Sequence, residues 1–285
     1  MYKIIRKKQL TDVIYLMDIY APLVASSGLP GQFVITINKE NGERIPLTIC
    51  DINKELGTVT IVFQTIGKST YELATFNEGD SLFAFVGPLG KASDLISMNE
   101  EELKNKNIIF IGGGVGIAPI YPQLKWLKEH GYHADVILGA RSKDILIFED
   151  EIEEVCNNLY ICTDDGSYGF KGNVCDMLKE IIKQKNYDHC VCIGPMMMMK
   201  FVCLLTKELN IPTVVSLNPI MVDGTGMCGA CRVLVDNKVK FACVDGPEFD
   251  GHLVDFDSAI KKQRYYLSEE EKAKNQYIIK GCGGK

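Results

Sequence analysis

The chain has 285 residues, of which 46% are hydrophobic and 24% charged, and its formal net charge is −6. This length predicts two domains, or two with an appendage, and the composition is typical of a folded globular protein. A slightly acidic chain without a long Lys/Arg run gives no basis for binding nucleic acid or an anionic membrane. No apolar run approaches the roughly 18 residues of a membrane span, and the first residues lack a signal-peptide core. We therefore expect a cytoplasmic protein.

Residues 1–98 are rich in predicted strands. Short apolar, β-branched segments alternate with turn residues: VIYLMDIYAP, GQFVITI, RIPLTICDI, TVTIVFQTI and DSLFAFVGPLG. Short strands separated by turns predict a small antiparallel barrel. One helical turn interrupts the barrel at KSTYELATF, where Ser69 or Thr70 can serve as the N-cap.

The pattern changes in residues 99–221. NIIFIGGGVGIAPIYPQLKWLKEHG contains a buried strand, a glycine turn and an amphipathic helix. Further buried strands, ADVILGARS, LYICTDDGS and HCVCIGP, alternate with helical segments such as NVCDMLKEIIKQ and MMMMKFVCLLTKELN. Strands that alternate with helices predict a doubly wound parallel sheet.

Residues 222–285 form the third predicted unit, which begins with a glycine-rich loop. In it, Asp223 and Cys228 are separated by four residues, Cys231 follows after two more, and Cys243 comes eleven residues later. Thiolates are soft ligands for iron–sulfur centres or zinc, and glycines let backbone N–H groups approach a cluster closely. A small hairpin with a turn at Asp236–Asn237 follows, and then a charged helix or a loosely attached tail.

The other cysteines do not share this arrangement. The chain has 11 cysteines, and outside the loop they are scattered, mostly among apolar neighbours. Reduced, buried thiols that pack as small hydrophobic groups explain most of these. The loop cysteines are therefore the ligand candidates, with a [2Fe–2S] cluster as the first interpretation and zinc as the alternative.

The glycine turn after the first strand of the second unit indicates a nucleotide site. The stretch Gly112-Gly113-Gly114-Val115-Gly116 follows a strand and opens a helix, where backbone N–H groups can hold a pyrophosphate. The spacing differs from G-x-G-x-x-G, because Pro119 stands near the place of the third glycine. Glycine-rich turns between strand and helix also occur without a ligand.

Two stretches of the predicted barrel have groups suited to anions. Arg44 and Thr48 lie on one strand, and Gly67-Lys68-Ser69-Thr70 adds a lysine and two hydroxyls at a helix start. Each stretch also has an ordinary explanation, since Arg44 can be a solvated surface residue and Ser69 a plain N-cap. Their occurrence together before a nucleotide-type unit favours a flavin site.

Five motifs occur in one order along the chain: R-x-P-[IL]-[ST] at 44–48, G-K-S-T at 67–70, G-P-L-G at 87–90, G-G-G-V-G-x-A-P at 112–119 and T-D-D-G-S at 163–167. Together they resemble the ferredoxin–NADP reductase superfamily. With the cysteine loop appended, essentially the whole chain resembles the iron–sulfur flavoprotein electron-transfer subunits of that superfamily.

The resemblance implies cofactors and the residues that bind them. For FAD these are Arg44, Pro46, Leu47 and Thr48 on one strand, Phe63 and Gln64 on the next, and the pyrophosphate turn Gly67, Lys68, Ser69 and Thr70. For NAD(H) they are Gly112, Gly113, Gly114, Val115, Gly116, Arg141, Asp164, Asp165, Gly166, Gly194 and Pro195. For the [2Fe–2S] cluster they are Asp223, Cys228, Cys231 and Cys243.

Asp223 separates two branches of this superfamily. The electron-transfer subunit of NAD-dependent dihydroorotate dehydrogenase has C-x4-C-x2-C-x11-C, whereas this chain keeps the spacing with Asp223 in the first place. Asp with three cysteines resembles the small subunit of NADH-dependent reduced ferredoxin:NADP oxidoreductase and its sulfide dehydrogenase relatives. The alternative is that Asp223 only starts a turn and something else binds the metal.

This resemblance implies an oxidoreductase subunit that exchanges hydride between NAD(H) and FAD and passes single electrons through the cluster. The acceptor would be a larger partner subunit with a second flavin and further iron–sulfur clusters, which links NAD(H), NADP(H) and, indirectly, ferredoxin by electron bifurcation. Subunits of dihydroorotate dehydrogenase or of a sulfide dehydrogenase are the alternatives. A redox-sensing adaptor module is the alternative of another class.

Overall fold

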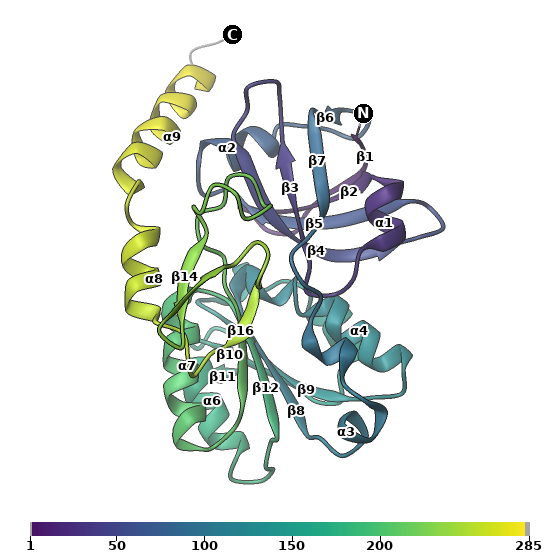
Figure 1. Cartoon of the computed structure of the whole chain (residues 1–285), viewed down its shortest axis with the longest axis vertical. Helices are drawn as coiled ribbons and strands as arrows, with labels where there is room; N and C mark the ends of the chain where they lie inside the picture. The colour runs from purple at the N-terminus through teal and green to yellow at the C-terminus, as the bar shows by residue number, and fades with distance from the viewer. Residues whose placement is uncertain (1, 283–285) are drawn as a thin grey trace.

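The computed structural model describes residues 2–282, whose two seven-stranded sheets are stacked along the long axis of the molecule (Figure 1). One sheet is an antiparallel barrel and the other is mainly parallel, as the sequence predicts. Within the described residues, no helix is long and apolar enough to cross a membrane.

The barrel is a nearly closed sheet with the strand order β6-β1-β2-β5-β4-β3-β7. Its apolar interior includes Ile19, Phe63 and Phe85, which are at most 2% exposed. Alternation along each strand places these residues inward. The strands are β1 (Tyr2–Gln9), β2 (Ile14–Tyr20), β3 (Phe33–Ile37), β4 (Arg44–Asn53), β5 (Thr58–Gln64), β6 (Ser81–Leu82) and β7 (Ala84–Leu89), with α1 (Pro22–Ser27) and α2 (Lys68–Leu73) between them.

The start of α2 differs from the sequence expectation. Its N-cap is Gly67, and neither Ser69 nor Thr70 holds that place. The Thr70 hydroxyl instead accepts hydrogen bonds from the backbone N–H groups of Ile66 (3.0 Å) and Gly67 (3.2 Å). A hydroxyl three residues into the helix thus reaches back to the N–H groups that the helix leaves free, which a glycine N-cap cannot do.

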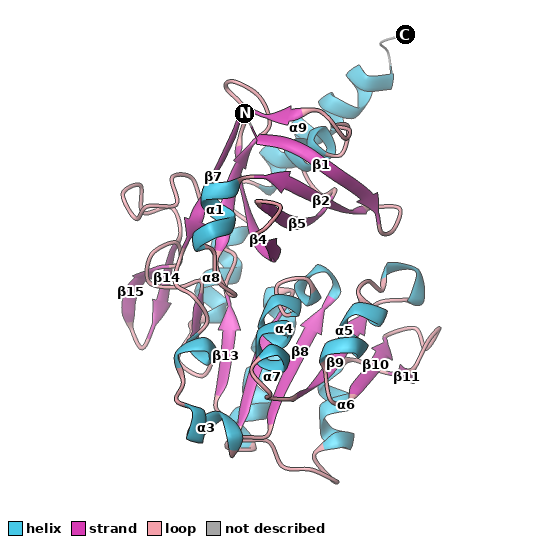
Figure 2. Ribbon diagram, turned by 90° about the vertical axis from the view of Figure 1, so that its right-hand side faces the viewer, coloured by secondary structure: helices cyan, strands magenta, loops and turns pink. Residues whose placement is uncertain are grey.

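The second sheet has the order β11-β10-β9-β8-β12-β13-β16 and is parallel except for its last strand. Helices cover both faces, α6 and α7 on one and α3, α4 and α5 on the other (Figure 2). The strands are β8 (Ile108–Gly113), β9 (Ala134–Ala140), β10 (Leu159–Thr163), β11 (Phe170–Lys171), β12 (His189–Ile193), β13 (Thr213–Ser216) and β16 (Glu248–Asp250). The helices are α3 (Glu100–Lys104), α4 (Tyr121–Glu129), α5 (Glu149–Val155), α6 (Val174–Ile181) and α7 (Met196–Glu208).

The last part of the chain joins both sheets. The predicted hairpin is confirmed as β14 (Arg232–Val235) and β15 (Lys238–Phe241), with Asp236 and Asn237 at positive φ in its turn. After β16 extends the large sheet, α8 (Phe256–Gln263) packs beside α7, and α9 (Leu267–Cys282) runs back along the barrel (Figure 1). The ammonium of Lys274 on α9 lies 5.2 Å from the ring centre of Tyr71 on α2.

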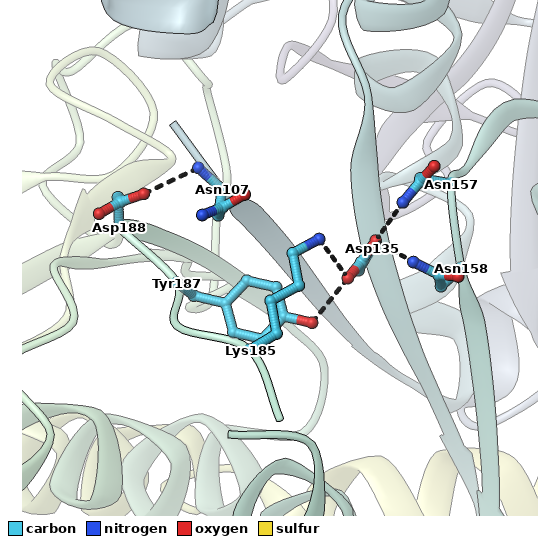
Figure 3. A network of polar contacts seen from close by, with 7 residues as sticks. All are labelled: Asn107, Asp135, Asn157, Asn158, Lys185, Tyr187 and Asp188. Carbon is cyan, nitrogen blue, oxygen red and sulfur yellow. Dashed lines mark hydrogen bonds and ion pairs between the residues drawn. The ribbon is translucent and has the colours of Figure 1, made fainter. Parts of the chain in front are cut away.

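A polar network closes the amino-terminal edge of the parallel sheet (Figure 3). The fully buried Asp135 of β9 accepts hydrogen bonds from the Lys185 ammonium (2.8 Å), the Tyr187 hydroxyl (2.7 Å) and the side-chain amides of Asn157 (3.1 Å) and Asn158 (2.9 Å). Burial alone would raise the pKa of Asp135, yet the hydrogen bonds, led by that from Lys185, hold the pKa below its usual value. The stability that this carboxylate contributes is therefore present above the usual carboxyl range and is lost in strong acid.

We predict that Lys185→Met lowers the free energy of unfolding by about 2 kcal/mol, because it removes the cationic partner of a buried carboxylate. The matched control is Lys183→Met, which breaks an exposed ion pair with Glu180 (2.7 Å) and has an expected cost below about 0.5 kcal/mol. Urea denaturation of both variants measures the difference. Equal losses in the two variants would contradict a stabilising role for the network.

Candidate functional site

The glycine turn and the Gly194-Pro195 step meet where the order of the parallel sheet reverses. From β8 the chain moves outward to β9 and β10, and it then returns to place β12 on the other side of β8. Ligands of open α/β sheets bind at the carboxyl ends of the strands at such a switch point. The turn from Gly112 to Gly116 ends β8, and Gly194 follows β12, so the fold brings these two predicted stretches together.

Close packing against neighbouring backbone and side chains explains most of these glycines. A Cβ atom on Gly116 would lie 2.7 Å from the Gly194 Cα, and one on Gly113 would lie 3.1 Å from the Pro195 ring. Gly114 differs, because it has φ +56° and a Cβ on it would meet nothing within 4 Å. The turn thus has room for a ligand at Gly114, while its neighbours hold β8 against β12.

The helix after this turn begins later than expected. Residues Gly114–Ile117 form a 3-10 turn, η2, and α4 begins at Tyr121. Hydrogen bonds between residues three apart, from Ala118 N–H to the Val115 carbonyl (3.1 Å) and from Ile120 N–H to the Ile117 carbonyl (3.0 Å), hold this segment in a 3-10 rather than an α-helical conformation. The predicted helix directly at the glycines is therefore wrong by about one turn of helix.

Arg141, Asp164, Asp165 and Gly166 lie together at the carboxyl ends of β9 and β10. The Asp165 N–H donates to the Arg141 carbonyl (3.2 Å), and Gly166 has φ +75°. All four residues are exposed. Hydrogen bonds from Ser167 lower the pKa of Asp165, so this edge combines a cation with two exposed acidic side chains at the carboxyl ends of the strands.

The predicted flavin strand is β4. Arg44 at its start is exposed, whereas Pro46, Leu47 and Thr48 are half-buried. Pro46 and Thr48 line a narrow crevice of about 20 Å³ against the loop after β13, opposite Ser216 and Met221. Backbone and side-chain groups of the flavin strand are thus open toward the second sheet.

On the neighbouring strand β5, the structure separates Phe63 from Gln64. Phe63 is 2% exposed and stacks on Tyr15 with 5.8 Å between ring centres, so its ring belongs to the barrel core. Gln64 is half-buried at the strand end. The structure therefore brings Gln64, but not the Phe63 ring, to the surface.

The turn before α2 has open space and groups of the kind that bind phosphate. A Cβ on Gly67 would meet nothing within 4 Å, and Lys68 and Ser69 are half-buried. The Ser69 hydroxyl donates to a carboxylate oxygen of Glu43, while Thr70 braces the turn itself. Free space, a lysine and a hydroxyl at one turn have the chemistry that a pyrophosphate requires.

The cysteine loop packs on the outer face of the barrel. Gly224 has φ +76°, and a Cβ on it would lie 2.7 Å from both the Ile35 and the Leu89 side chains. Ile35 of β3 is paired with Pro46 of β4 in the antiparallel ladder. The loop is therefore one strand away from the predicted flavin strand.

The four predicted metal ligands occur on this loop and its flank. The sulfur atoms of Cys231 and Cys243 are buried and lie 3.2 Å apart, while Cys228 is exposed. Two thiolates on one tetrahedral metal with bonds of about 2.3 Å lie about 3.7 Å apart, so this pair is close to the spacing for one metal atom.

A two-iron cluster takes two ligands on each iron, whereas zinc needs four around one point. Among the described side chains, residues 2–279, no three His, Cys, Asp or Glu residues converge as a single ion would require. A close pair with two further donors nearby on the loop therefore has a donor set that fits a two-iron cluster.

Asp223 braces the loop in this structure. One of its carboxylate oxygens accepts from the Thr225 N–H (2.9 Å) and the other from the Cys228 N–H (2.8 Å). These backbone hydrogen bonds lower the pKa of Asp223, so the group is a carboxylate at neutral pH. Each oxygen keeps a lone pair for a metal, and the same residue can both shape the loop and bind iron.

A polar group that the sequence did not single out lies at the junction of these regions. Glu248 of β16 accepts a hydrogen bond from Gln123 of α4, whose side-chain carbonyl accepts from Ser93. In the segment DGPEF, Glu248 looks like an ordinary exposed loop acid. Only contacts between residues distant in sequence distinguish it, so no local signal could have found it.

Two family models match the chain. One is the iron–sulfur cluster binding domain of dihydroorotate dehydrogenase B, over residues 218–255, and the other is an oxidoreductase NAD-binding domain, over residues 110–204. The matched ranges contain the cysteine loop and the glycine turn. The predictions of an iron–sulfur cluster and of NAD(H) are confirmed at the level of these families.

Similar proteins extend over the whole chain. A Clostridium beijerinckii protein, described as an uncharacterized protein in the adh 3' region, is 61% identical over 99% of this chain and 98% of its own. A Thermotoga maritima homologue of the electron transfer subunit of dihydroorotate dehydrogenase B (NAD(+)) is 44% identical over 99% and 96%. The Fusobacterium nucleatum electron transfer subunit of that enzyme is 32% identical over 85% and 92%.

A solved structure with a similar fold is a chain of the NADH-dependent reduced ferredoxin-NADP oxidoreductase, described for flavin-based electron bifurcation. It is 44% identical, with a TM-score of 0.90 over 98% of both chains. The Amycolatopsis cytochrome P450 reductase GcoB, 18% identical with a TM-score of 0.60 over 73% of this chain and 65% of its own, shares the fold alone.

The barrel, the parallel sheet and the cysteine loop define an oxidoreductase of the ferredoxin–NADP reductase class. Within that class, the chain belongs to the family of dihydroorotate dehydrogenase B electron-transfer subunits and their homologues.

We predict that Asp223→Cys still assembles a [2Fe–2S] cluster but changes its EPR g-values and reduction potential, because a softer thiolate replaces an oxygen ligand. Asp245→Asn is the matched control, since Asp245 braces the nearby Phe241 N–H (2.7 Å) without being a predicted ligand. EPR spectroscopy and redox titration of the reduced proteins measure both. An unchanged spectrum and potential in Asp223→Cys would show that Asp223 is not a ligand.

Proposed function

We propose that this chain is the electron-transfer subunit of a flavoenzyme of the NADH-dependent reduced ferredoxin:NADP oxidoreductase type. It would work with a larger partner subunit that carries a further flavin and further iron–sulfur clusters, with ferredoxin as an indirect partner. The 44% identity to that enzyme over 98% of both chains supports this assignment. Asp223 in place of the first cysteine favours it over a dihydroorotate dehydrogenase subunit, which the family also permits.

The observation that carries the proposal is the contact of the cysteine loop with the barrel beside the flavin strand. Gly224 packs on Ile35, and Ile35 is paired with Pro46, so a cluster on the loop and a flavin on β4 would be neighbours. NAD(H), FAD and a [2Fe–2S] cluster, when bound, supply hydride exchange and single-electron transfer. The chain itself supplies binding groups and alignment.

We assign each set of residues to a cofactor according to where the residues lie. We assign the open turn at Gly114 and the edge at Arg141 to the dinucleotide, and Asp223 with the three loop cysteines to the cluster. Arg44, Thr48, Lys68 and Ser69 are assigned to FAD. We place the unit boundaries at 1–98, 99–221 and 222–285, although β16 of the third unit extends the sheet of the second.

NADH is proposed over NADPH as the reductant. Arg141 and Lys143 have the charge to bind a 2′-phosphate, but Asp144 and the exposed Asp164 and Asp165 nearby oppose it. The Lys143 ammonium also lies 4.5 Å from the ring centre of Tyr168. This cation–π contact within the chain competes with any contact between Lys143 and a 2′-phosphate. A cytoplasmic location completes the proposal, in keeping with the ten cysteines between Cys50 and Cys243, none of which forms a disulfide.

We predict that NADH bleaches the flavin absorbance band of the anaerobic protein rapidly, and NADPH at least about tenfold more slowly, a difference of about 1.4 kcal/mol in barrier height.

Arg44→Ala should weaken FAD binding by about tenfold or more, because it removes a cation from the flavin strand. Arg6→Ala, at an exposed arginine paired with Asp18, is the matched control.

Stopped-flow absorbance and flavin content measure these effects. A wild-type protein that retains FAD but is not bleached by NADH would reject the oxidoreductase assignment and favour the redox-sensing adaptor.

A further inference from the structure

Three parts of the chain meet at one chain of hydrogen bonds. The Gln123 side-chain amide on α4 donates to a carboxylate oxygen of Glu248 on β16 (2.7 Å). The Ser93 hydroxyl, on the segment that leaves the barrel, donates to the Gln123 carbonyl oxygen (3.0 Å). Ser93 and Gln123 are only 2% and 1% exposed, whereas Glu248 is half-buried. The flavin barrel, the dinucleotide unit and the cluster unit each contribute one of these residues.

The helix in the middle of this chain connects the two proposed cofactor sites. α4 follows the glycine turn, and its Lys125 ammonium binds the Asp51 carboxylate of the flavin strand β4 (2.8 Å). Gln123 lies two residues before Lys125 on the same short helix. Any shift of α4 at Gln123 therefore moves the dinucleotide turn relative to the flavin strand.

Glu248 also lies beside the crevice at the flavin strand. It is the cross-strand partner of Ser216, and directly paired residues project from the same face of a sheet. Ser216 lines the crevice together with Pro46 and Thr48, and so does Pro247, the residue before Glu248. The backbone of Glu248 is thus next to two residues that line this crevice, Ser216 and Pro247.

The charges around Glu248 favour its neutral form. Desolvation is the main cause that raises the pKa of Glu248 to about 7. The charge of Asp94 on η1 (Asp94–Ser97) acts in the same direction, whereas the hydrogen bond from Gln123 acts in the opposite one. α4 presents the neutral Gln123, and β13 presents Ser216. Among the side chains that the structure describes, residues 2–279, no lysine or arginine forms an ion pair with Glu248. Since folding favours the protonated acid, its contribution to stability is present in acid and is lost as the pH rises through about 7.

We propose that Glu248 is a positioning residue for hydride transfer, which holds α4 and the glycine turn against the flavin barrel while its carboxyl group is protonated. Ionisation strengthens the hydrogen bond from Gln123, but it also leaves a charge in the junction that no described lysine or arginine pairs with. The cost of desolvating that charge draws water into the junction and loosens α4. This inference rests on the proposed function for its kinetic consequence. Its structural consequence, a pH-dependent loosening of α4, does not.

The kinetic test is the rate of flavin reduction by NADH in the holoprotein from pH 6 to pH 9. We expect the wild-type rate to fall about fivefold or more across this range, with a midpoint set by Glu248. Glu248→Gln, which keeps the acceptor for Gln123 without the charge, should stay near the low-pH rate throughout. Gln123→Met, which breaks the connection, should be slow at every pH while FAD content and the EPR spectrum of the cluster stay unchanged.

The control is Asp250→Asn, which removes one charge from the exposed end of the same strand and should keep the wild-type profile. A Glu248→Gln protein with the wild-type pH profile, or an Asp250→Asn protein with a flat profile, would overturn the proposal.

Hydrogen–deuterium exchange of α4, corrected for intrinsic pH dependence, tests the structural consequence without any turnover. Protection of α4 should fall above about pH 7 in the wild type and persist in Glu248→Gln. Equal protection at pH 6 and pH 8.5 in the wild type would overturn the inference even if NADH reduces the flavin. If protection of α4 falls above about pH 7 in a protein whose flavin NADH does not reduce, the pH-dependent loosening of α4 is supported and the oxidoreductase function is rejected instead.

Discussion

The contact between the cysteine loop and the outer face of the barrel is the constraint on which the rest of the structure depends. A single-electron path requires its carriers to be close, and a loop of this kind can approach a β-sheet only where its own backbone lacks side chains. Gly224 meets that requirement, since its positive φ and missing Cβ let the loop lie against Ile35 and Leu89. The adjacent strand, β4, has the groups assigned to flavin. The position of β16 at the edge of the parallel sheet then anchors the far side of the loop.

The same principle operates at the switch point of the parallel sheet. Gly116 and Gly194 allow the turn after β8 to touch the turn after β12, and the resulting backbone contact holds open the space beside Gly114. Most of these neighbouring glycines thus pack closely, and Gly114 alone among them borders open space. The amino-terminal edge of the sheet has the opposite character, because the Asp135 network there is fully hydrogen-bonded and far along the strands from this switch point.

Much of the architecture was predictable from local patterns. Short β-branched segments between turns predicted the barrel, and strands alternating with helices predicted the parallel sheet, because both periodicities record which side of an element is buried. The hairpin turn at Asp236–Asn237 was predictable because both residue types tolerate positive φ. The N-cap of α2 and the start of α4 were predicted wrongly, since glycine at a cap and a 3-10 turn depend on small differences between competing hydrogen bonds.

The sequence by itself determined the class of chemistry, because the type and spacing of these residues can be read directly along the chain. Asp223 and three cysteines occur on one loop, and the glycine turn directly follows a strand. The tertiary structure alone decided which of the predicted residues share a surface. It placed the Phe63 ring in the barrel core although Gln64 beside it is accessible, and it joined Ser93, Gln123 and Glu248 from three separate segments. Their hydrogen bonds link residues as far as 125 positions apart, and such pairings are set by the packing of whole elements, which no local pattern encodes.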